Sequence, residues 1–411
     1  MSPFSTITTA LRIAAFALLG LLGPHLGAVP VAPTLDRLSP EARALVARAF
    51  ADLPPDQPIV DVHAHLVGLG KEGTGIWVNP RRFSPRHPGL WLQTRLYMGA
   101  AGVEDTSHFD ALYVERLAGL ARGFGHPVRI HLLAMDHAYR EDGTVDLART
   151  EFHVPNAYVV EICARYPDLF VPVISVHPAR KDALAELQRW ALKGVRWVKW
   201  LPNSQGIDPA DPRHEPFYRR MKELGMTLLT HVGEEKAVAA KDAQTLGNPL
   251  RFRRALDLGL RVVMAHCGSL GSNADLDRPG RRETNFNLFL RLLAEPRFRE
   301  NLLGDISALA QVNRMPGPML EVLRRPDLQA RLVQGSDFPL PAVNVLVWTR
   351  QMVRHGLITR SERRALNEIF RDNPLRFDFV LKRTLRHPVT KGGLAKEVFL
   401  GSALAGLPGA P

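Results

Sequence analysis

Short apolar runs alternate with longer amphipathic segments along most of the chain. Eight runs have the length and apolar content of buried strands. They are Ile59–His65, Ile130–Met135, Phe170–His177, Val195–Leu201, Thr227–His231, Val262–His266, Leu302–Ser307 and Leu332–Asp337. Between them lie helix candidates, several with Pro or Gly at their ends. These include Asn156–Tyr166, Lys181–Lys193, His214–Leu224 and Asn285–Leu293.

This alternation predicts an α/β protein, and two architectures fit it. One is a (β/α)₈ TIM barrel, in which each parallel strand is followed by an outer helix. The other is an open, doubly wound sheet, which explains the alternation equally well. Polar residues recur at the C-terminal ends of many of the runs, and only the barrel accounts for that. We therefore expect a barrel.

The segments outside the repeating pattern suggest four divisions of the chain. Residues 1–33 read as a leader, 34–58 as an N-terminal helix and linker, 59–390 as the barrel, and 391–411 as a flexible tail rich in Gly, Ala and Pro. Ser39 and Pro40 supply an N-cap and a first helical residue, so a helix is predicted from there to about Asp52. The long stretch Leu66–Arg129 reads as an insertion after the first strand and a candidate lid over the barrel mouth.

The leader contains an apolar run, Ile13–Gly23, preceded by Arg12 and ended by Pro24. Its length is that of a signal-peptide core, and it is shorter than the roughly 20 residues that span a bilayer. Leu26-Gly27-Ala28 matches a cleavage site poorly. We therefore expect either an exported protein, periplasmic or secreted, or one associated with a membrane through an uncleaved anchor.

Composition and charge limit the classes of partner. The 411 residues are 45% hydrophobic and 23% charged, as in globular proteins, with a net charge of +12. No concentrated Lys/Arg run marks a nucleic-acid footprint, so a small-molecule substrate is expected, with an anionic one favoured modestly by the charge. Cys163 and Cys267 are expected to be buried apolar residues rather than a disulfide.

Polar residues at the ends of the predicted strands carry the chemistry. His63 and His65 stand two residues apart at the end of the first strand, so both imidazoles point to one face and can share a metal. Lys199, His231, His266 and Asp337 lie at the ends of the fourth, fifth, sixth and eighth. Imidazole and carboxylate ligands suit Zn²⁺, with Mn²⁺ or Fe²⁺ as alternatives.

In this combination the chain resembles the amidohydrolase superfamily, in its amidohydrolase-related branch of hydrolases and decarboxylases. The matching pieces are Asp61-Val62-His63-Ala64-His65, Thr230-His231-Val232-Gly233, Ala265-His266-Cys267-Gly268, Gly304-Asp305-Ile306-Ser307 and Gly335-Ser336-Asp337-Phe338-Pro339. The resemblance implies a divalent metal held by His63, His65, His231 and Asp337. It places His266 nearby, as an acid/base group or a ligand of a second metal.

Lys199 has two interpretations. Members of the superfamily with two metals use a carboxylated lysine at this strand end as a bridge, and Lys199 stands there. The alternative is an ordinary salt-bridged or solvent-reaching lysine. The direction of its side chain separates the two.

Several loop residues are candidates for contacting substrate or for supporting the ligands. A guanidinium in the mouth could bind a carboxylate through two hydrogen bonds. The candidates are Trp77, Arg81, Arg95, Asn203 and Arg314. Glu234 and Glu235 follow His231 and could cap a helix or hold that ligand in place by a hydrogen bond.

Hydrolysis is the predicted reaction. A metal lowers the pKa of a bound water from about 15.7 towards about 7, and Asp337 takes the proton as the water attacks an amide, ester or lactone carbonyl. The metal or His266 would stabilise the oxyanion. Two alternatives are non-oxidative decarboxylation of a carboxylic acid, which an arginine in the mouth would favour, and a barrel that only binds a ligand.

Overall fold

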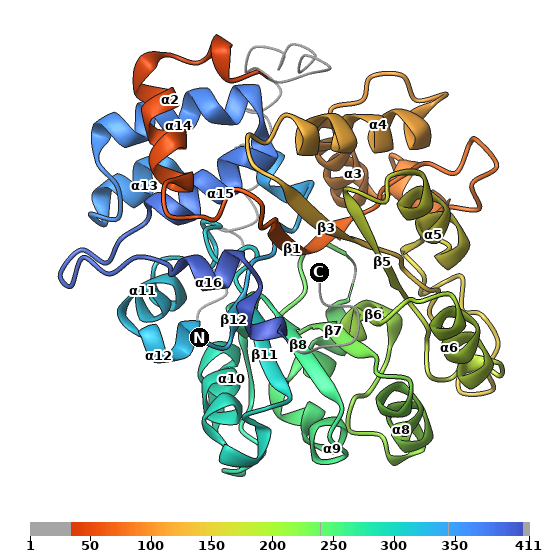
Figure 1. Cartoon of the computed structure of the whole chain (residues 1–411). Helices are drawn as coiled ribbons and strands as arrows, with labels where there is room; N and C mark the ends of the chain where they lie inside the picture. Colours follow the sequence, from red (N-terminus) through yellow and green to blue (C-terminus); the bar gives the residue numbers. More distant parts are fainter. Residues whose placement is uncertain (1–33, 239, 344, 406–411) are drawn as a thin grey trace.

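Eight parallel strands form a ring at the centre of the protein (Figure 1). The computed structural model describes residues 34–238, 240–343 and 345–405. In ring order the strands are β1 (Ile59–His65), β3 (Val128–Leu133), β5 (Phe170–Ile174), β6 (Trp197–Trp200), β7 (Thr227–His231), β8 (Arg261–Ala265), β11 (Leu302–Asp305) and β12 (Leu332–Val333). The ring closes where the Val62 amide donates to the Gln334 carbonyl at 2.9 Å and the His65 amide to that of Phe338 at 2.8 Å. The predicted TIM barrel is confirmed.

The barrel strands are apolar on both faces because each face packs against a different layer. Side chains pointing inward, such as Val62, Leu133 and Trp197, form a core inside the ring. Those pointing outward pack against the helices, for example Leu187 and Trp190 from one face of α6. This double burial explains why the strands read as continuous apolar runs.

The helices of the barrel layer surround the ring (Figure 1). They are α4 (Phe109–Arg122), α5 (Asn156–Arg165), α6 (Ala183–Leu192), α8 (Glu215–Glu223), α9 (Arg253–Asp257), α10 (Asn285–Ala294), α11 (Gly317–Arg324), α12 (Pro326–Gln329), α13 (Thr349–Arg354), α14 (Arg360–Asp372) and α15 (Pro374–Thr384). Short elements in the loops are α7 (Pro202–Gln205) and the hairpin of β9 (Ser272–Ala274) and β10 (Arg282–Thr284). The four helices expected from sequence correspond to α5, α6, α8 and α10.

The helix predicted after Ser39 is α2 (Pro40–Phe50). The Ser39 hydroxyl accepts from the Ala42 amide at 3.2 Å and donates to Glu368 of α14 at 2.7 Å. The cap therefore both starts the helix and ties it to the barrel. Asn373 separates α14 from α15 because its side chain accepts from the first amides of α15.

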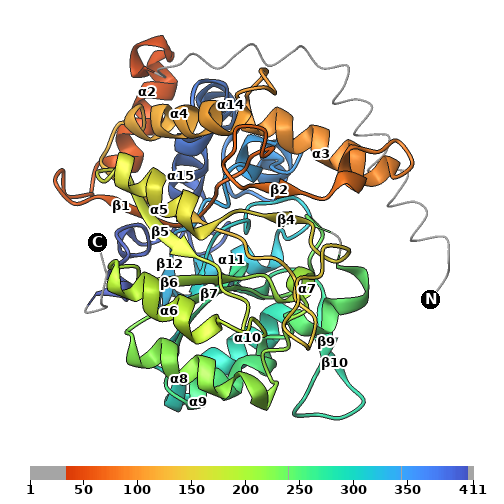
Figure 2. The ribbon, with the colours of Figure 1, turned by 90° about the vertical axis from the view of Figure 1, so that its right-hand side faces the viewer.

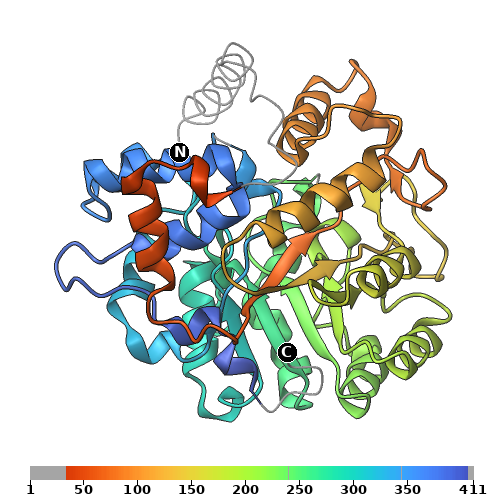
Figure 3. The same ribbon diagram turned by 45° about the horizontal axis from the view of Figure 1, so that its top comes forward.

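The insertion after β1 lies over the C-terminal ends of the strands (Figures 2 and 3). It contains β2 (Trp77–Val78), a short 3₁₀ turn and α3 (Pro88–Ala101), and β2 pairs with β4 (Phe152–His153). From α3, the Gln93 amide and the Tyr97 hydroxyl each donate, at 3.0 Å, to carbonyls of the loop after β7. The insertion is shorter than predicted because α4 belongs to the outer layer of the barrel and packs on α15.

The C-terminal segment differs from the loose tail expected. It forms α16 (Lys396–Phe399) and a 3₁₀ turn, and the Val398 carbonyl accepts from the Gln334 amide at 2.9 Å. Leu404 packs with the inward-facing side chains of the ring. The apolar residues Val398, Phe399 and Leu404 therefore hold this segment against the barrel.

The predicted leader, residues 1–33, and residues 406–411 lie outside the part of the chain that the structure describes. Within the described part, no helix is both long enough and apolar enough to cross a membrane.

Candidate metal centre

His63, His65 and Asp337 meet at the C-terminal end of the barrel. One carboxylate oxygen of Asp337 lies 3.5 Å from His63 Nε2 and 3.0 Å from His65 Nε2. The candidate ligand atoms of the three residues all lie within 4.8 Å of one another. A small cation can therefore contact all three side chains at once.

Asp305, at the end of β11, sets the orientation of His63. Its Oδ2 lies 2.9 Å from His63 Nδ1, and both side chains are fully buried. Because a carboxylate only accepts, Nδ1 carries the proton and Nε2 presents its lone pair to the site. The other oxygen, Oδ1, accepts from the amides of His266 at 2.8 Å and Ser307 at 2.9 Å, and from the Ser307 hydroxyl.

His231 also has a carboxylate beside its ring. Its Nδ1 lies 3.4 Å from Glu235 Oε2, while its Nε2 is buried without a hydrogen-bond partner among the described residues. A buried, unpaired ring nitrogen costs free energy unless a ligand satisfies it. His231 stands outside the tight His63–His65–Asp337 group, with its ring centroid 5.2 Å from that of His266.

His266 lies between His63 and His231. Its ring is stacked at 5.1 Å from that of His63, and its Nδ1 contacts the Ser307 carbonyl at 3.2 Å and hydroxyl at 2.7 Å. The carbonyl can only accept, so Nδ1 carries the proton and Nε2 is the basic nitrogen. Burial lowers the pKa of His63, His231 and His266 well below the usual value, so all three rings are neutral, as metal binding requires.

The backbone is held in an unfavourable conformation at two of these positions. His266 has φ of 58° and Asp337 has φ of 60°, in the left-handed region that non-glycine residues seldom adopt. Such conformations cost about 1–3 kcal/mol and collect at functional sites. Here they aim a histidine and a carboxylate at the same point.

Lys199 of β6 points into the centre. Its Nζ lies 3.1 Å from His63 Nε2, and the side chain is buried. Burial lowers the pKa of Lys199 to about 8, against the opposing effect of Asp305 and Asp337. Because the barrel interior encloses Lys199, its side chain does not reach solvent. The bridging and the salt-bridged interpretations both stay predictions.

Arg314 is the one substrate-binding candidate that the fold brings to the centre. The side chain is buried, its Nη1 donates to the Ser269 hydroxyl at 3.0 Å, and its Nε has no partner among the described residues. Burial lowers its pKa, while Asp337 and Glu235 raise it. The charge of Arg314 in turn disfavours protonation of His231 and His266.

The other candidates lie elsewhere. Arg81 is half-exposed and donates to the Ala148 carbonyl at 2.6 Å, and Arg95 stacks on Trp91 at the surface. The buried Asn203 amide donates to the Gly233 carbonyl at 3.2 Å. Trp77 lies in β2, beside the His137 ring. Local spacing alone does not show which loop residues face the mouth.

Two groups near the centre received no role in the sequence interpretation, namely the Asp305–Ser307 pair and Tyr97 of α3. The strand end Gly304-Asp305-Ile306-Ser307 carried the signal for the first, an acidic residue directly after an apolar run. Tyr97 donates to the Ala237 carbonyl at 3.0 Å, in the loop after β7, and burial raises its pKa, with Glu235 and Asp337 adding to that rise. Nothing in the sequence around Tyr97 marks it.

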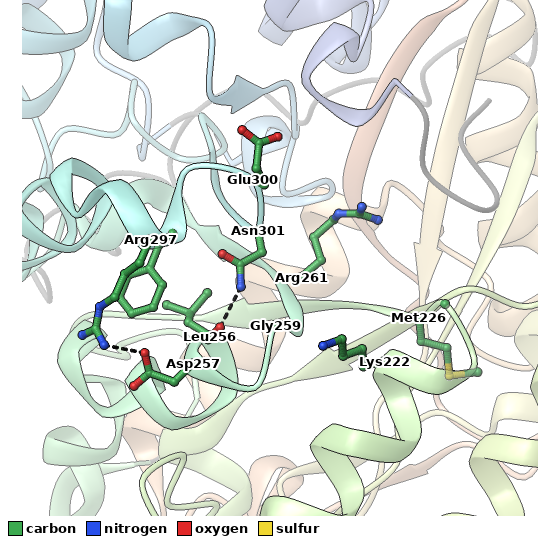
Figure 4. Close-up of a pocket in the computed structure, with 11 residues that line it drawn as sticks. Lys222, Met226, Leu256, Asp257, Gly259, Arg261, Arg297, Glu300 and Asn301 are labelled. Atoms are coloured by element: carbon green, nitrogen blue, oxygen red, sulfur yellow. Dashed lines mark hydrogen bonds and ion pairs between the residues drawn. The ribbon is translucent and has the colours of Figure 1, made fainter.

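A separate cavity of about 620 Å³ opens at the opposite, N-terminal end of the barrel (Figure 4). Four of its six polar side chains bond to the protein. Arg297 pairs with Asp257 at 2.6 Å, and Asn301 and Lys222 donate to neighbouring carbonyls at 2.8 and 2.9 Å. None of the residues that line this cavity belongs to the candidate metal centre.

A comparison of the sequence with protein-family models agrees with the barrel and its strand-end residues. Residues 60–377 match the family model described as amidohydrolase, which covers both the barrel and the candidate ligands. The chain belongs to the amidohydrolase family. No curated protein matches this amidohydrolase significantly.

The chain is also similar to several solved structures. An uncharacterized TIM-barrel protein from Bordetella bronchiseptica is 19% identical, with a TM-score of 0.47, over 69% of this chain and 86% of that one. A candidate 2-pyrone-4,6-dicarboxylic acid hydrolase from Pseudomonas putida is 20% identical, with a TM-score of 0.40, over 69% and 83%. A 5-carboxyvanillate decarboxylase from Sphingomonas paucimobilis is 16% identical, with a TM-score of 0.45, over 75% and 96%. These likenesses concern the fold.

The residues present fit a divalent cation. Two imidazoles and one carboxylate converge, His63 presents a lone pair set by Asp305, and His231 Nε2 lacks a partner within the described chain. Three protein ligands with an open position are typical of a catalytic zinc site, and the same donors also suit Mn²⁺ or Fe²⁺.

Proposed function

We propose that this amidohydrolase is a metal-dependent hydrolase acting on an amide, ester or lactone carbonyl. One observation carries the proposal. The candidate ligand atoms of His63, His65 and Asp337 lie within 4.8 Å of one another, and the buried Asp305 fixes the orientation of the His63 ring. Buried polar groups without a structural partner are costly, so their concentration at one strand edge favours a ligand there.

The metal that suits these donors best is Zn²⁺, held by His63, His65 and Asp337, with His231 completing the set. A bound divalent cation would supply a water of pKa about 7 and polarise the scissile carbonyl. The remaining chemistry belongs to the side chains around it.

Asp337 is the proposed general base. Its Oδ1 faces both His63 and His65, so it can accept the proton that the attacking water loses. Burial opposes its ionisation, but the hydrogen bond from His65 keeps its pKa below the usual value. Asp337 is therefore ionised and ready to accept a proton at neutral pH.

We assign proton transfer to His266 and the binding of negative charge to Arg314. His266 presents a basic Nε2, which suits a group that accepts and returns a proton rather than one that donates first. Arg314 is the nearby cation, because it donates to the Ser269 hydroxyl and the Ser269 amide donates to the His266 carbonyl at 2.9 Å. We assign it to bind a carboxylate of the substrate or the developing oxyanion.

The carboxylation state of Lys199 would determine whether the centre holds one metal or two. Its inward direction and its 3.1 Å contact with His63 Nε2 suit the bridging role that the superfamily gives a carboxylated lysine. As an uncarboxylated ammonium, it would instead repel a cation from the same space. Mass spectrometry of native protein, with and without added bicarbonate, measures the carboxylation directly.

Decarboxylation of a carboxylic acid is the second candidate. Arg314 favours it, because a buried guanidinium without an ion-pair partner among the described residues would hold a substrate carboxylate next to the metal. Carbon dioxide release and hydrolysis products, followed in parallel on esters, lactones, amides and aromatic acids, separate the two reactions.

The metal hypothesis is tested first by elemental analysis of purified protein, with one to two equivalents of divalent transition metal expected. His63→Ala should lose metal and activity together and keep the barrel circular dichroism spectrum. His126→Ala is the matched control, since that half-buried histidine stacks on Phe50 and hydrogen-bonds only to backbone carbonyls, far from the centre. Full activity in His63→Ala, or in metal-free protein, would contradict the proposal.

A further inference from the structure

Helix α3 of the insertion exposes apolar side chains that no part of the described chain covers. Only three of its fourteen residues are buried, although the helix is apolar along most of its length. Trp91 is 36% exposed, and Leu92 and Leu96 are half-buried. On a helix Leu92 and Leu96 lie on the side away from Thr94 and Tyr97, which face the barrel, while Trp91 lies at the edge between the two sides, three residues before Thr94. A surface helix normally carries polar residues on that outer side.

Neighbouring elements extend this apolar surface. Phe83, in the turn before α3, is 45% exposed, and Leu147, in the loop after β3, is 51% exposed. The two segments lie together because Asn79 donates to the Leu147 carbonyl at 3.4 Å. We call the surface formed by Phe83, Trp91, Leu92, Leu96 and Leu147 the insertion face.

The segment of the insertion that contains the 3₁₀ turn and α3 carries charge of one sign, although Glu72, Glu104 and Asp105 flank it. From residue 73 to residue 103 there are four arginines and no aspartate or glutamate. Arg86 and Arg95 are exposed and form no ion pair within the described chain, and Arg95 stacks on the Trp91 ring at 4.7 Å. Aromatic and aliphatic residues beside unpaired arginines are typical of helices that lie at a lipid surface.

We propose that the insertion face docks on an anionic lipid surface. Charge complementarity favours this occupant over a second copy of the chain, because a symmetric dimer would bring the same arginines face to face with no carboxylate between them. The inner side of α3 bonds the loop after β7 through Gln93 and Tyr97. Docking would therefore place the mouth of the barrel at the membrane.

The test compares full-length variants for partitioning onto phosphatidylcholine vesicles with and without phosphatidylglycerol. Leu92→Gln with Leu96→Gln should weaken partitioning by about tenfold per leucine, since each would lose apolar burial. Arg86→Gln with Arg95→Gln should weaken it by about fivefold per arginine, and only on anionic vesicles at low salt. The leader is identical in every variant, so a difference between them reports on α3.

The matched control is Leu184→Gln with Leu192→Gln, two exposed leucines on α6. It should partition like the parent protein. Equal partitioning of the Leu92/Leu96 variant and this control would overturn the proposal. So would equal binding to neutral and anionic vesicles, or a dimer in solution that the Leu92/Leu96 variant abolishes without any change in vesicle binding.

Discussion

Replacing Asp305 with asparagine tests whether a buried carboxylate sets the metal-binding nitrogen of His63. The substitution keeps the shape of the side chain. Oδ1 accepts from three donors, so the single oxygen of the new amide is expected to take that place, which turns the NH₂ group towards His63 Nδ1. His63 Nδ1 must then accept, and the ring proton moves to Nε2. A protonated Nε2 has no lone pair for a metal.

The size of the effect follows from that tautomer change. Losing the outer hydrogen bond of a metal-binding histidine costs about 10- to 100-fold in metal affinity, or roughly 1.4–2.7 kcal/mol. The fold should tolerate the change better than the site does, because two backbone amides keep their acceptor at 2.8 and 2.9 Å. We therefore expect metal affinity to fall by at least tenfold while cooperative unfolding is retained.

The assay is competition of Asp305→Asn with a chromophoric chelator, with zinc as the titrant. Asp110→Asn is the matched control: Asp110 is also buried and accepts from backbone amides, at 2.6 Å from Leu69 and 3.1 Å from Gly70, but touches no candidate ligand. Its zinc affinity should equal that of the parent. Zinc affinity in Asp305→Asn within twofold of the parent would refute the reasoning about the His63 tautomer.

Three further predictions concern packing, the metal and pH. A Cβ at Gly335 would lie 2.8 Å from the Cβ of His63. Gly335→Ala should therefore lower the free energy of unfolding, measured in denaturant titrations, by about 1–3 kcal/mol. Gly317→Ala is the control and should leave it unchanged, because a Cβ at Gly317 would have no atom within 4 Å. Chelation should lower the melting temperature and added zinc restore it, whereas an unchanged melting curve would exclude tight binding. Burial lowers the pKa of His137 and His153, stacked at 3.9 Å, to about 4 from 6.5, so the unfolded chain takes up their protons first. Their contribution to stability is complete above pH 6.5 and lost as the pH falls towards 4. Protection factors of amides in β2 and β4, corrected for the intrinsic exchange rate at each pH, should therefore be lower at about pH 5 than at about pH 7.5, and equal protection factors would contradict this.

The barrel could be predicted from sequence because its burial pattern is local. Each strand is apolar on both faces, and each outer helix shows its own period, so the alternation is visible in short windows. The sequence predicted the ends of elements less accurately, since the second strand lies at Val128–Leu133 rather than Ile130–Met135. Helix α4, assigned to the insertion from sequence, belongs to the outer layer of the barrel. The Gly- and Ala-rich C-terminal segment could not be predicted as ordered, because it contains few apolar residues. Those residues are buried against the barrel, a surface that other parts of the chain form.

The sequence by itself determined the chemistry that this protein carries: two histidines on one strand face, and further histidines, a lysine and an aspartate at other strand ends. Spacing within one strand fixes which side chains share a face, so the His63–His65 pair could be inferred without coordinates. Only the tertiary structure decided that Asp305 orients His63, that Lys199 points inward, and that Arg314 rather than Arg81 or Arg95 is buried, against the loop that follows His266. These contacts join residues far apart in the chain, and closure of the barrel, rather than any local pattern, sets their distances and their burial.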